Sequence, residues 1–186
     1  TSNFGENLLI NANNNITDNV LLSFNNKSIS IDNIIVFLKS EYEKKRVIIY
    51  HRYGYKRQNL SLGFSELSLL AYSNNSMTSL EKYFMPYSFL YEVEANSANT
   101  SNIMWRFDFS YYWTRSIIWG ELLIDDYALD HLSPPKVGIL LGLRKELFSL
   151  PFILRYTKIN RWVYNYGYDA KELRFVEQEL PLGNII

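Results

Sequence analysis

The chain has 186 residues, enough for one domain with a sizeable core or for a piece of a larger one. Its 19 basic and 19 acidic residues balance, which argues against nucleic acid as a partner. It has no cysteine, so disulfides and thiolate metal sites are excluded, and it has no apolar run of about 18 residues that could form a transmembrane helix. It begins with Thr1 and no signal-peptide pattern, which indicates a mature chain or a piece of one.

The first 45 residues form a segment of unclear assignment, either strands or a short helix. A strand pattern covers residues 18–25. Residues 30–45 are the best helix candidate of the chain, because Asp32 could cap the first turn and the end of the stretch is charged. The β-branched run 34–36 suits a strand equally well, so both alternatives stay open.

Strand patterns dominate residues 46–186. Most of the candidate strands are about 9–14 residues long, longer than the five or six residues of ordinary globular strands. Short turns alternate with longer links, which predicts an all-β fold built as an antiparallel meander. The predicted strands are 46–57, 59–72, 88–96, 103–113, 115–127, 136–148 and 151–165.

The two faces of the predicted strands differ sharply in polarity. In residues 105–113 every second side chain is aromatic, and the side chains between them are mostly polar. In a soluble sandwich the apolar face would be the core, whereas in a membrane barrel it would meet lipid and the polar face would line the lumen. Trp105 and Trp113 bracket one strand over about 27 Å, close to the height of an outer-membrane apolar band.

Carboxylates stand out in the apolar stretch "IIWGELLIDDYALD", residues 117–130. Glu121 and Asp125 share one strand face, where arginines on neighbouring strands could pair with them and brace the wall of a barrel. A second interpretation is sugar binding, because carboxylates accept hydroxyl protons and the aromatic cluster Trp162–Tyr168 offers flat apolar surfaces. A catalytic pair is the third, but Glu121 and Asp125 lie about 13–14 Å apart along the strand, too far for a glycosidase; Asp108 could come closer to Glu121.

Other kinds of functional site find little support. The two histidines, His51 and His131, lack metal-ligand spacing. No glycine-rich phosphate loop and no serine nucleophile elbow occur. We therefore expect no metal, no cofactor and no catalytic residues.

Several segments, taken in order over roughly residues 46–184, resemble the Wzi family of capsule-assembly outer-membrane proteins. Residues 1–45 carry no such match. The barrel of this family has more strands than the sequence predicts for this chain, so the resemblance implies a fragment of a larger barrel. The segments that carry the resemblance are "HRYGYKRQNLSLGFSEL" (51–67), "YFMPYSFLYEVE" (83–94), "NIMWRFDFSYYW" (102–113), "WGELLIDDY" (119–127), "PPKVGILLGLRKE" (134–146), "LRYTKINRWVYNY" (154–166) and "ELPLGN" (179–184).

The resemblance implies a non-enzymatic transmembrane β-barrel of the bacterial outer membrane that takes part in the assembly or surface attachment of capsular polysaccharide or exopolysaccharide. Its partners would be that polysaccharide, outer-membrane lipid and other envelope proteins. A general outer-membrane channel or structural barrel and a soluble carbohydrate-binding β-domain remain as alternatives. The predicted glycan-binding residues are Asp108, Glu121, Asp125, Arg155, Arg161, Trp162 and Tyr164.

Overall fold

The computed structural model describes residues 18–38, 44–72, 89–90, 101–125, 136–148, 150–161, 163–164, 174, 176–177 and 180–181. All of the elements in this part of the chain are strands. The described residues contain no helix that is long and apolar enough to cross a membrane. The strands are β1 (Asp18–Asn25), β2 (Ile29–Phe37), β3 (Lys45–Arg57), β4 (Leu60–Tyr72), β5 (Ser101–Trp113), β6 (Ser116–Asp125), β7 (Val137–Leu147), β8 (Leu150–Ile159), β9 (Val176–Glu177) and β10 (Leu180–Pro181).

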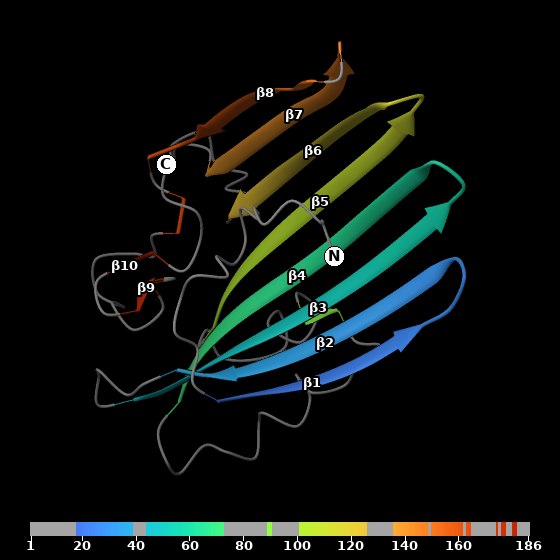
Figure 1. Cartoon of the computed structure of the whole chain (residues 1–186). Helices are drawn as coiled ribbons and strands as arrows, with labels where there is room; N and C mark the ends of the chain where they lie inside the picture. Colours follow the sequence, from blue (N-terminus) through green and yellow to red (C-terminus); the bar gives the residue numbers. More distant parts are fainter. Residues whose placement is uncertain are drawn as a thin grey trace.

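Strands β1 to β8 form one antiparallel sheet in which each strand pairs with its neighbours in the sequence (Figure 1). The predicted all-β antiparallel meander is thereby confirmed. The sheet is open: among the described strands, β1 and β8 each pair with one neighbour only. β9 and β10 form a separate two-stranded sheet.

Two of the predicted strands differ from the structure. The strand expected at 151–165 ends at Ile159, and a turn follows in which the Val163 amide donates to the Asn160 carbonyl. Most of the strand expected at 88–96 lies outside the described residues, and its two described members, Phe89 and Leu90, are not in a strand.

The ambiguity in the first 45 residues resolves to strands where the structure describes them. Residues 29–37 form β2 instead of opening a helix, because β1 and β3 pair along both of its edges. Asp32 caps no helix; it accepts a hydrogen bond from the Ser23 hydroxyl on β1. β1 and β2 thus continue the sheet that β3 begins.

The short turns between β1 and β2, β3 and β4, β5 and β6, and β7 and β8 lie at one end of the eight-stranded sheet, along the right and top of Figure 1. The β3–β4 and β5–β6 connections are two residues long, and the Asn26 side chain closes the β1–β2 turn by accepting from the Ser28 and Ile29 amides. Thr114 and Arg115 both have positive φ, at 33° and 53°, the conformation of a two-residue hairpin turn that usually selects asparagine and glycine. The longer links, 73–100 and 126–136, connect the strands at the opposite end.

Pleating separates the sheet into a polar face and an apolar face. The polar face carries Asp32 on β2, Arg52 on β3, Ser65 on β4, Asp108 on β5, Glu121 on β6 and the residues in register with them. The apolar face is exposed over all eight strands. Its exposed large side chains are Val20, Leu22, Phe24, Ile29, Phe37, Tyr55, Leu62, Phe107, Phe109, Tyr111, Trp113, Ile118, Leu122, Leu141, Leu147, Leu150, Phe152, Leu154 and Tyr156.

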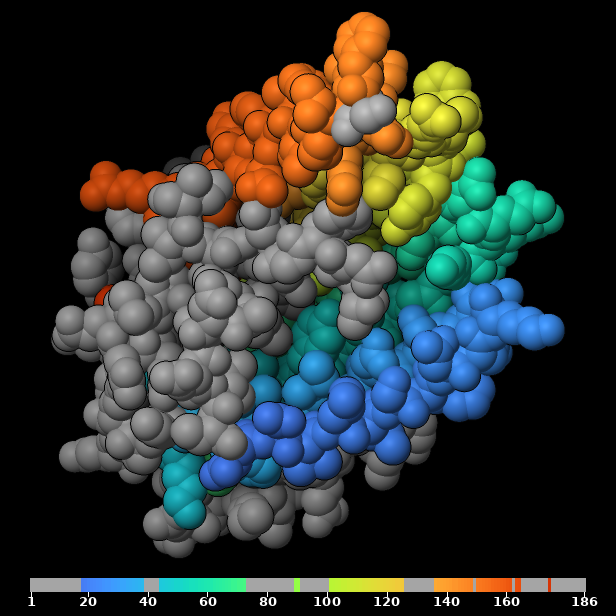
Figure 2. Space-filling view, viewed as in Figure 1, coloured from blue at the N-terminus to red at the C-terminus, as the bar shows by residue number. Residues whose placement is uncertain are grey.

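The buried core lies at the end of the sheet with the long links. On the polar face, Tyr50, Leu67 and Met104 pack with Val163 and Tyr164 from beyond β8. On the apolar face, a smaller cluster of Val47, Ile49 and Leu70 packs beneath Leu90. In the space-filling view a hollow lies between the blue strands β1 and β2 and the orange strands β7 and β8, with parts of the teal strands at its floor (Figure 2).

Glycine at position 142 makes room for Trp119. These residues face each other across β6 and β7, and a Cβ added to Gly142 would lie 2.1 Å from Cε2 of the indole. We expect Gly142→Ala to lower the free energy of unfolding by about 1–3 kcal/mol, because the indole must move out of a packed core. Urea unfolding measures the change. In a Trp119→Leu background the same substitution should cost much less, and an equal cost in both backgrounds would contradict the contact.

Candidate functional site

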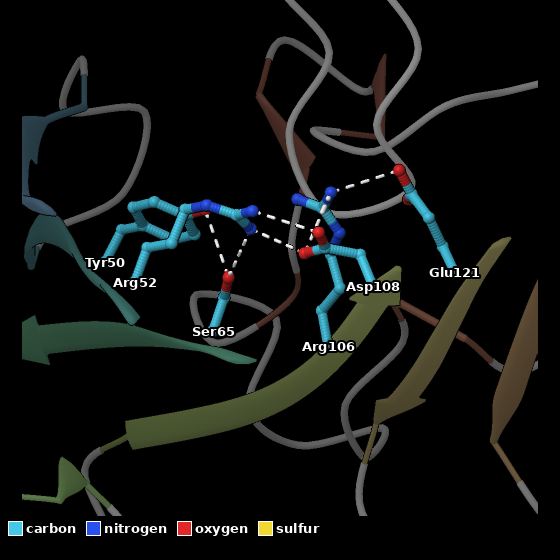
Figure 3. A network of polar contacts seen from close by, with 6 residues as sticks. All are labelled: Tyr50, Arg52, Ser65, Arg106, Asp108 and Glu121. Atoms are coloured by element: carbon cyan, nitrogen blue, oxygen red, sulfur yellow. Dashed lines mark hydrogen bonds and ion pairs between the residues drawn. The ribbon is translucent and has the colours of Figure 1, made fainter. Parts of the chain in front are cut away.

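Four charged side chains meet at the centre of the polar face (Figure 3). Arg52 on β3 holds Asp108 on β5 through two parallel bonds, Nη1–Oδ1 at 2.5 Å and Nη2–Oδ2 at 2.9 Å. Nη2 of Arg106 lies 3.3 Å from Oδ1 of Asp108 and 3.0 Å from Oε1 of Glu121 on β6. We call these four residues the arginine–carboxylate network; it ties β3, β5 and β6 together.

Strand β4 separates β3 from β5, and the glycine that it places between Arg52 and Asp108 allows their contact. Gly63 lies between them, and a Cβ there would fall 2.5 Å from Oδ1 of Asp108 and 2.6 Å from Nη2 of Arg52. The guanidinium therefore reaches the carboxylate directly over the β4 backbone. Ser65 adds its hydroxyl, which accepts from Nη1 of Arg52 at 3.3 Å and hydrogen-bonds the Tyr50 hydroxyl at 3.2 Å.

The network is electrically balanced and sheltered from solvent. Two guanidinium groups face two carboxylates, and the side chains of Arg106 and Glu121 are 2% and 3% exposed. Charges removed from water in this way need partners with good geometry, and bidentate guanidinium–carboxylate pairs supply it. Asp108 and Glu121, both predicted as glycan-binding residues, are thus brought together around one arginine, which is the arrangement of a brace between strands.

Asp125 has a different role from the other carboxylates on this face. It is fully buried at the end of β6, and its Oδ2 accepts the Tyr164 backbone amide at 2.6 Å. Tyr164 has a φ of 71° and is itself buried. Asp125 therefore fixes the turn after β8 onto the polar face. Asp125 and Tyr164, both predicted as glycan-binding residues, are thus in contact with each other.

The remaining predicted glycan-binding residues are more dispersed. Arg155 lies on the polar face of β8, in register with Gly142 on β7, and is exposed. Arg161 is exposed in the turn after β8. Trp162 lies outside the described residues.

Sequence reasoning missed a polar site on the apolar face. Glu66 is buried on β4, where its two oxygens accept the Leu90 amide and the Trp105 indole N–H, both at 3.0 Å. His51 is its buried register partner on β3. Once the two-residue turn at Gln58 and Asn59 is known, the register that pairs His51 with Glu66, and Arg52 with Ser65, follows from the sequence; the cover by Leu90 does not.

A hollow of about 670 Å³ lies at the end of the sheet with the short turns. It is bordered by the β3–β4 and β5–β6 turns and by the ends of β7 and β8, and the strand residues that line it lie mainly on the polar face. We call it the hairpin hollow; it is lined by Asn59, Tyr112, Trp113, Thr114, Arg115, Ser116, Ile117, Arg144, Glu146 and Pro151. Arg144, on the strand next to β6, lines this hollow.

A metal centre finds no support in the part of the chain that the structure describes, since no three histidine, aspartate or glutamate side chains gather there. Comparison with known proteins adds no assignment: no family model, no curated protein and no solved structure matches the chain.

The arginine–carboxylate network predicts a large effect from removing its central cation. Arg106→Met leaves Asp108 and Glu121 buried together, so the free energy of unfolding should fall by about 3–5 kcal/mol. The matched control is Arg57→Met at the exposed end of β3, which should change stability by less than about 0.5 kcal/mol. Equal urea midpoints for the two variants would exclude the bracing role.

The turn after β8 predicts a loss of stability at alkaline pH. Burial raises the pKa of the Tyr164 hydroxyl well above its ordinary value of about 10, and the Asp125 and Glu121 carboxylates raise it further. The neutral hydroxyl is thus favoured in the folded state, so its contribution is complete below pH 10 and is lost as the pH rises toward the folded pKa. Urea unfolding between pH 8 and 11 should show a steeper decline for the wild type than for Tyr164→Phe; parallel declines would contradict this.

Proposed function

We propose that the chain forms part of the wall of a β-barrel in the bacterial outer membrane and takes part, without catalysis, in attaching capsular polysaccharide or exopolysaccharide to the cell surface. The observation that carries the first half is the exposed apolar face. It extends from Val20 on β1 to Tyr156 on β8. Contiguous apolar surface of this extent marks a membrane or protein contact, not a face toward water.

The distribution of charge over the two faces supports lipid contact. On β5, the side chains of Phe107 and Phe109 are 44% and 38% exposed, while Asp108 between them points to the opposite face. A lysine or arginine facing lipid at the bilayer midplane costs about 2–4 kcal/mol, a penalty that the placement of Arg52 and Arg106 avoids. Most charged residues of the apolar face lie within three residues of a strand end: Asp18, Lys45, Arg57, Lys145 and Lys158.

Two ionisable residues of the apolar face, Glu66 and His51, lie far from a strand end, and both are covered. Glu66 is buried beneath Leu90, and its register partner His51 is buried as well. Phe89, next to Leu90, packs at ring-centroid distances of 6.3 and 6.5 Å from Tyr53 and Phe64 of the apolar face. Leu90 therefore covers the Glu66 carboxylate, and Phe89 beside it adds an aromatic side chain to the apolar face.

The connections fit the asymmetry of such barrels, which have short periplasmic turns and longer extracellular loops. Strand lengths of 8 to 13 residues also suit tilted strands that cross a bilayer. In this orientation the hairpin end of the sheet is periplasmic, and the end with Asp125 and Tyr164 faces the cell exterior.

The polysaccharide role rests on the resemblance of residues 46–184 to the Wzi family. The exterior end of the polar face carries Arg161 and Tyr164, next to Trp162 in the sequence. Arginine suits uronic-acid carboxylates because its guanidinium donates two parallel hydrogen bonds. We infer that this end contacts the glycan.

A structural or channel-forming barrel is the second candidate, and the balanced network favours it. Asp108 and Glu121 are occupied by Arg52 and Arg106, so they brace the wall in either case. A soluble carbohydrate-binding domain fits less well, because within the described ranges no second sheet covers the apolar face.

Labelling of single cysteines tests the membrane wall, since the chain has no cysteine of its own. We expect Phe109→Cys, in protein reconstituted in lipid vesicles, to resist a membrane-impermeant maleimide, because lipid covers it. Ser110→Cys, the next residue on the opposite face, should react from the aqueous lumen. Rapid reaction at position 109 with protection at 110 would show that the faces are inverted and the domain is soluble.

Polysaccharide retention on cells tests the second part of the proposed function, the attachment of polysaccharide to the cell surface. Trp162→Ala and Arg161→Ala should each release most of the surface polysaccharide while the protein stays in the membrane fraction, because contacts to the glycan are lost but the wall is intact. Arg57→Ala, a loss of charge at the opposite end, is the matched control. Normal retention in both variants would leave the structural barrel, and oligosaccharide cleavage that disappears with Glu121→Gln would show that the protein is an enzyme.

A further inference from the structure

The hairpin hollow holds two arginines that no carboxylate of the described residues neutralises. Arg115 and Arg144 both line it and both are exposed. Neither makes an ion pair with any residue that the structure describes. Glu146 is the one carboxylate of the lining, and its backbone amide donates to the Arg115 carbonyl at 3.2 Å, which ties the β5–β6 turn to β7.

The contrast with the centre of the same face is informative. Arg52 and Arg106 are held by carboxylates at 2.5 to 3.3 Å and serve the fold. Arg115 and Arg144 make no ion pair of this kind with the residues that the structure describes. The positive φ of Arg115 belongs to its hairpin turn, as it does at Gln58 and Phe148 in the neighbouring turns.

We propose that the hairpin hollow binds the carboxylate of an acidic saccharide, with Arg115 and Arg144 as the cations that hold it. The hollow has the size of a small-molecule site, which is about 300–1,000 Å³. A guanidinium binds a carboxylate through two parallel hydrogen bonds, so two arginines on adjoining elements can hold one sugar acid in a defined orientation.

The rest of the lining favours a sugar acid over a phosphate. Two arginines and one glutamate leave a single net positive charge, which matches a monoanionic carboxylate better than a dianionic phosphate. Asn59, Thr114 and Ser116 supply amide and hydroxyl groups for sugar hydroxyls, and Glu146 can accept hydroxyl protons. Tyr112, on the polar face of β5, adds aromatic surface.

The saccharide class rests on the proposed polysaccharide function, but the site does not coincide with the one proposed there. The hairpin hollow lies at the short-turn end of the sheet, whereas Arg161 and Tyr164 lie beyond the other end of β8. Under the proposed orientation it would engage acidic glycan on the periplasmic side. Loss of the hollow and loss of the exterior contact can therefore be separated by experiment.

Calorimetric titration of the purified, detergent-solubilised chain with trigalacturonate, maltotriose and inorganic phosphate tests this inference. We expect trigalacturonate to bind and the other two probes not to bind. Arg144→Gln and Arg115→Gln should each weaken binding by about tenfold or more, since each removes a hydrogen-bonded charge. Arg57→Gln, at the same end of the sheet but on the apolar face, should bind like the wild type.

Three results would overturn the inference: no binding of trigalacturonate, equal binding of maltotriose, or unchanged affinity in both arginine variants. Phosphate binding that is lost in the same two variants would show a phosphate site instead. Polysaccharide retention on cells is read separately. Trigalacturonate binding together with normal retention in the Arg161→Ala and Trp162→Ala variants would support the hollow and reject the exterior contact, and the reverse pattern would do the opposite.

Discussion

The guanidinium of Arg106 lies between Asp108 and Glu121, and the organisation of the polar face depends on that contact. This contact joins β5 to β6. Asp108 also binds Arg52 of β3, which reaches it over Gly63, where no side chain intervenes. Because the four charges cancel, the sheet can bury them without a net charge. An unpaired member would be costly, so a change of register that separated these charges would be unfavourable.

Because most charged side chains of the strand centres lie on the polar face, the opposite face is apolar. Neighbouring side chains of a strand point to opposite faces, and in most of these strands the residues between the inward polar ones are apolar. A sheet of this kind in water would need a second layer over Phe107, Leu122 and their neighbours. A bilayer meets the same need without further protein, which is why the exposed face carries the membrane proposal.

The polar face is divided along its length. Its centre is saturated by internal ion pairs, whereas both ends carry exposed arginines, Arg115 and Arg144 at the hairpin end and Arg161 beyond β8. If a glycan contacts this protein, the ends of the polar face suit it better than the braced middle. The contact between Asp125 and Tyr164 then has a plain structural role, since it positions the turn next to Arg161 and Trp162.

Most of the strands and the composition of their faces could be predicted from the sequence, because a two-residue period is a local property that does not depend on neighbouring strands. It predicted the meander and placed Asp108, Glu121 and Asp125 on one side. It did not decide between strand and helix for residues 30–45, since β-branched residues in 34–36 and a capping signal at Asp32 pointed in opposite directions until pairing with β1 and β3 favoured the strand.

Which groups meet depends on the tertiary structure. The bond from Arg52 to Asp108 depends on the register of three strands and on the missing side chain at Gly63. The cover over Glu66 depends on a link of 28 residues between β4 and β5, and the hairpin hollow forms where two turns lie beside the ends of β7 and β8. These contacts join residues far apart in the sequence, so their geometry follows from pairing across the whole sheet and not from the local pattern of any one strand.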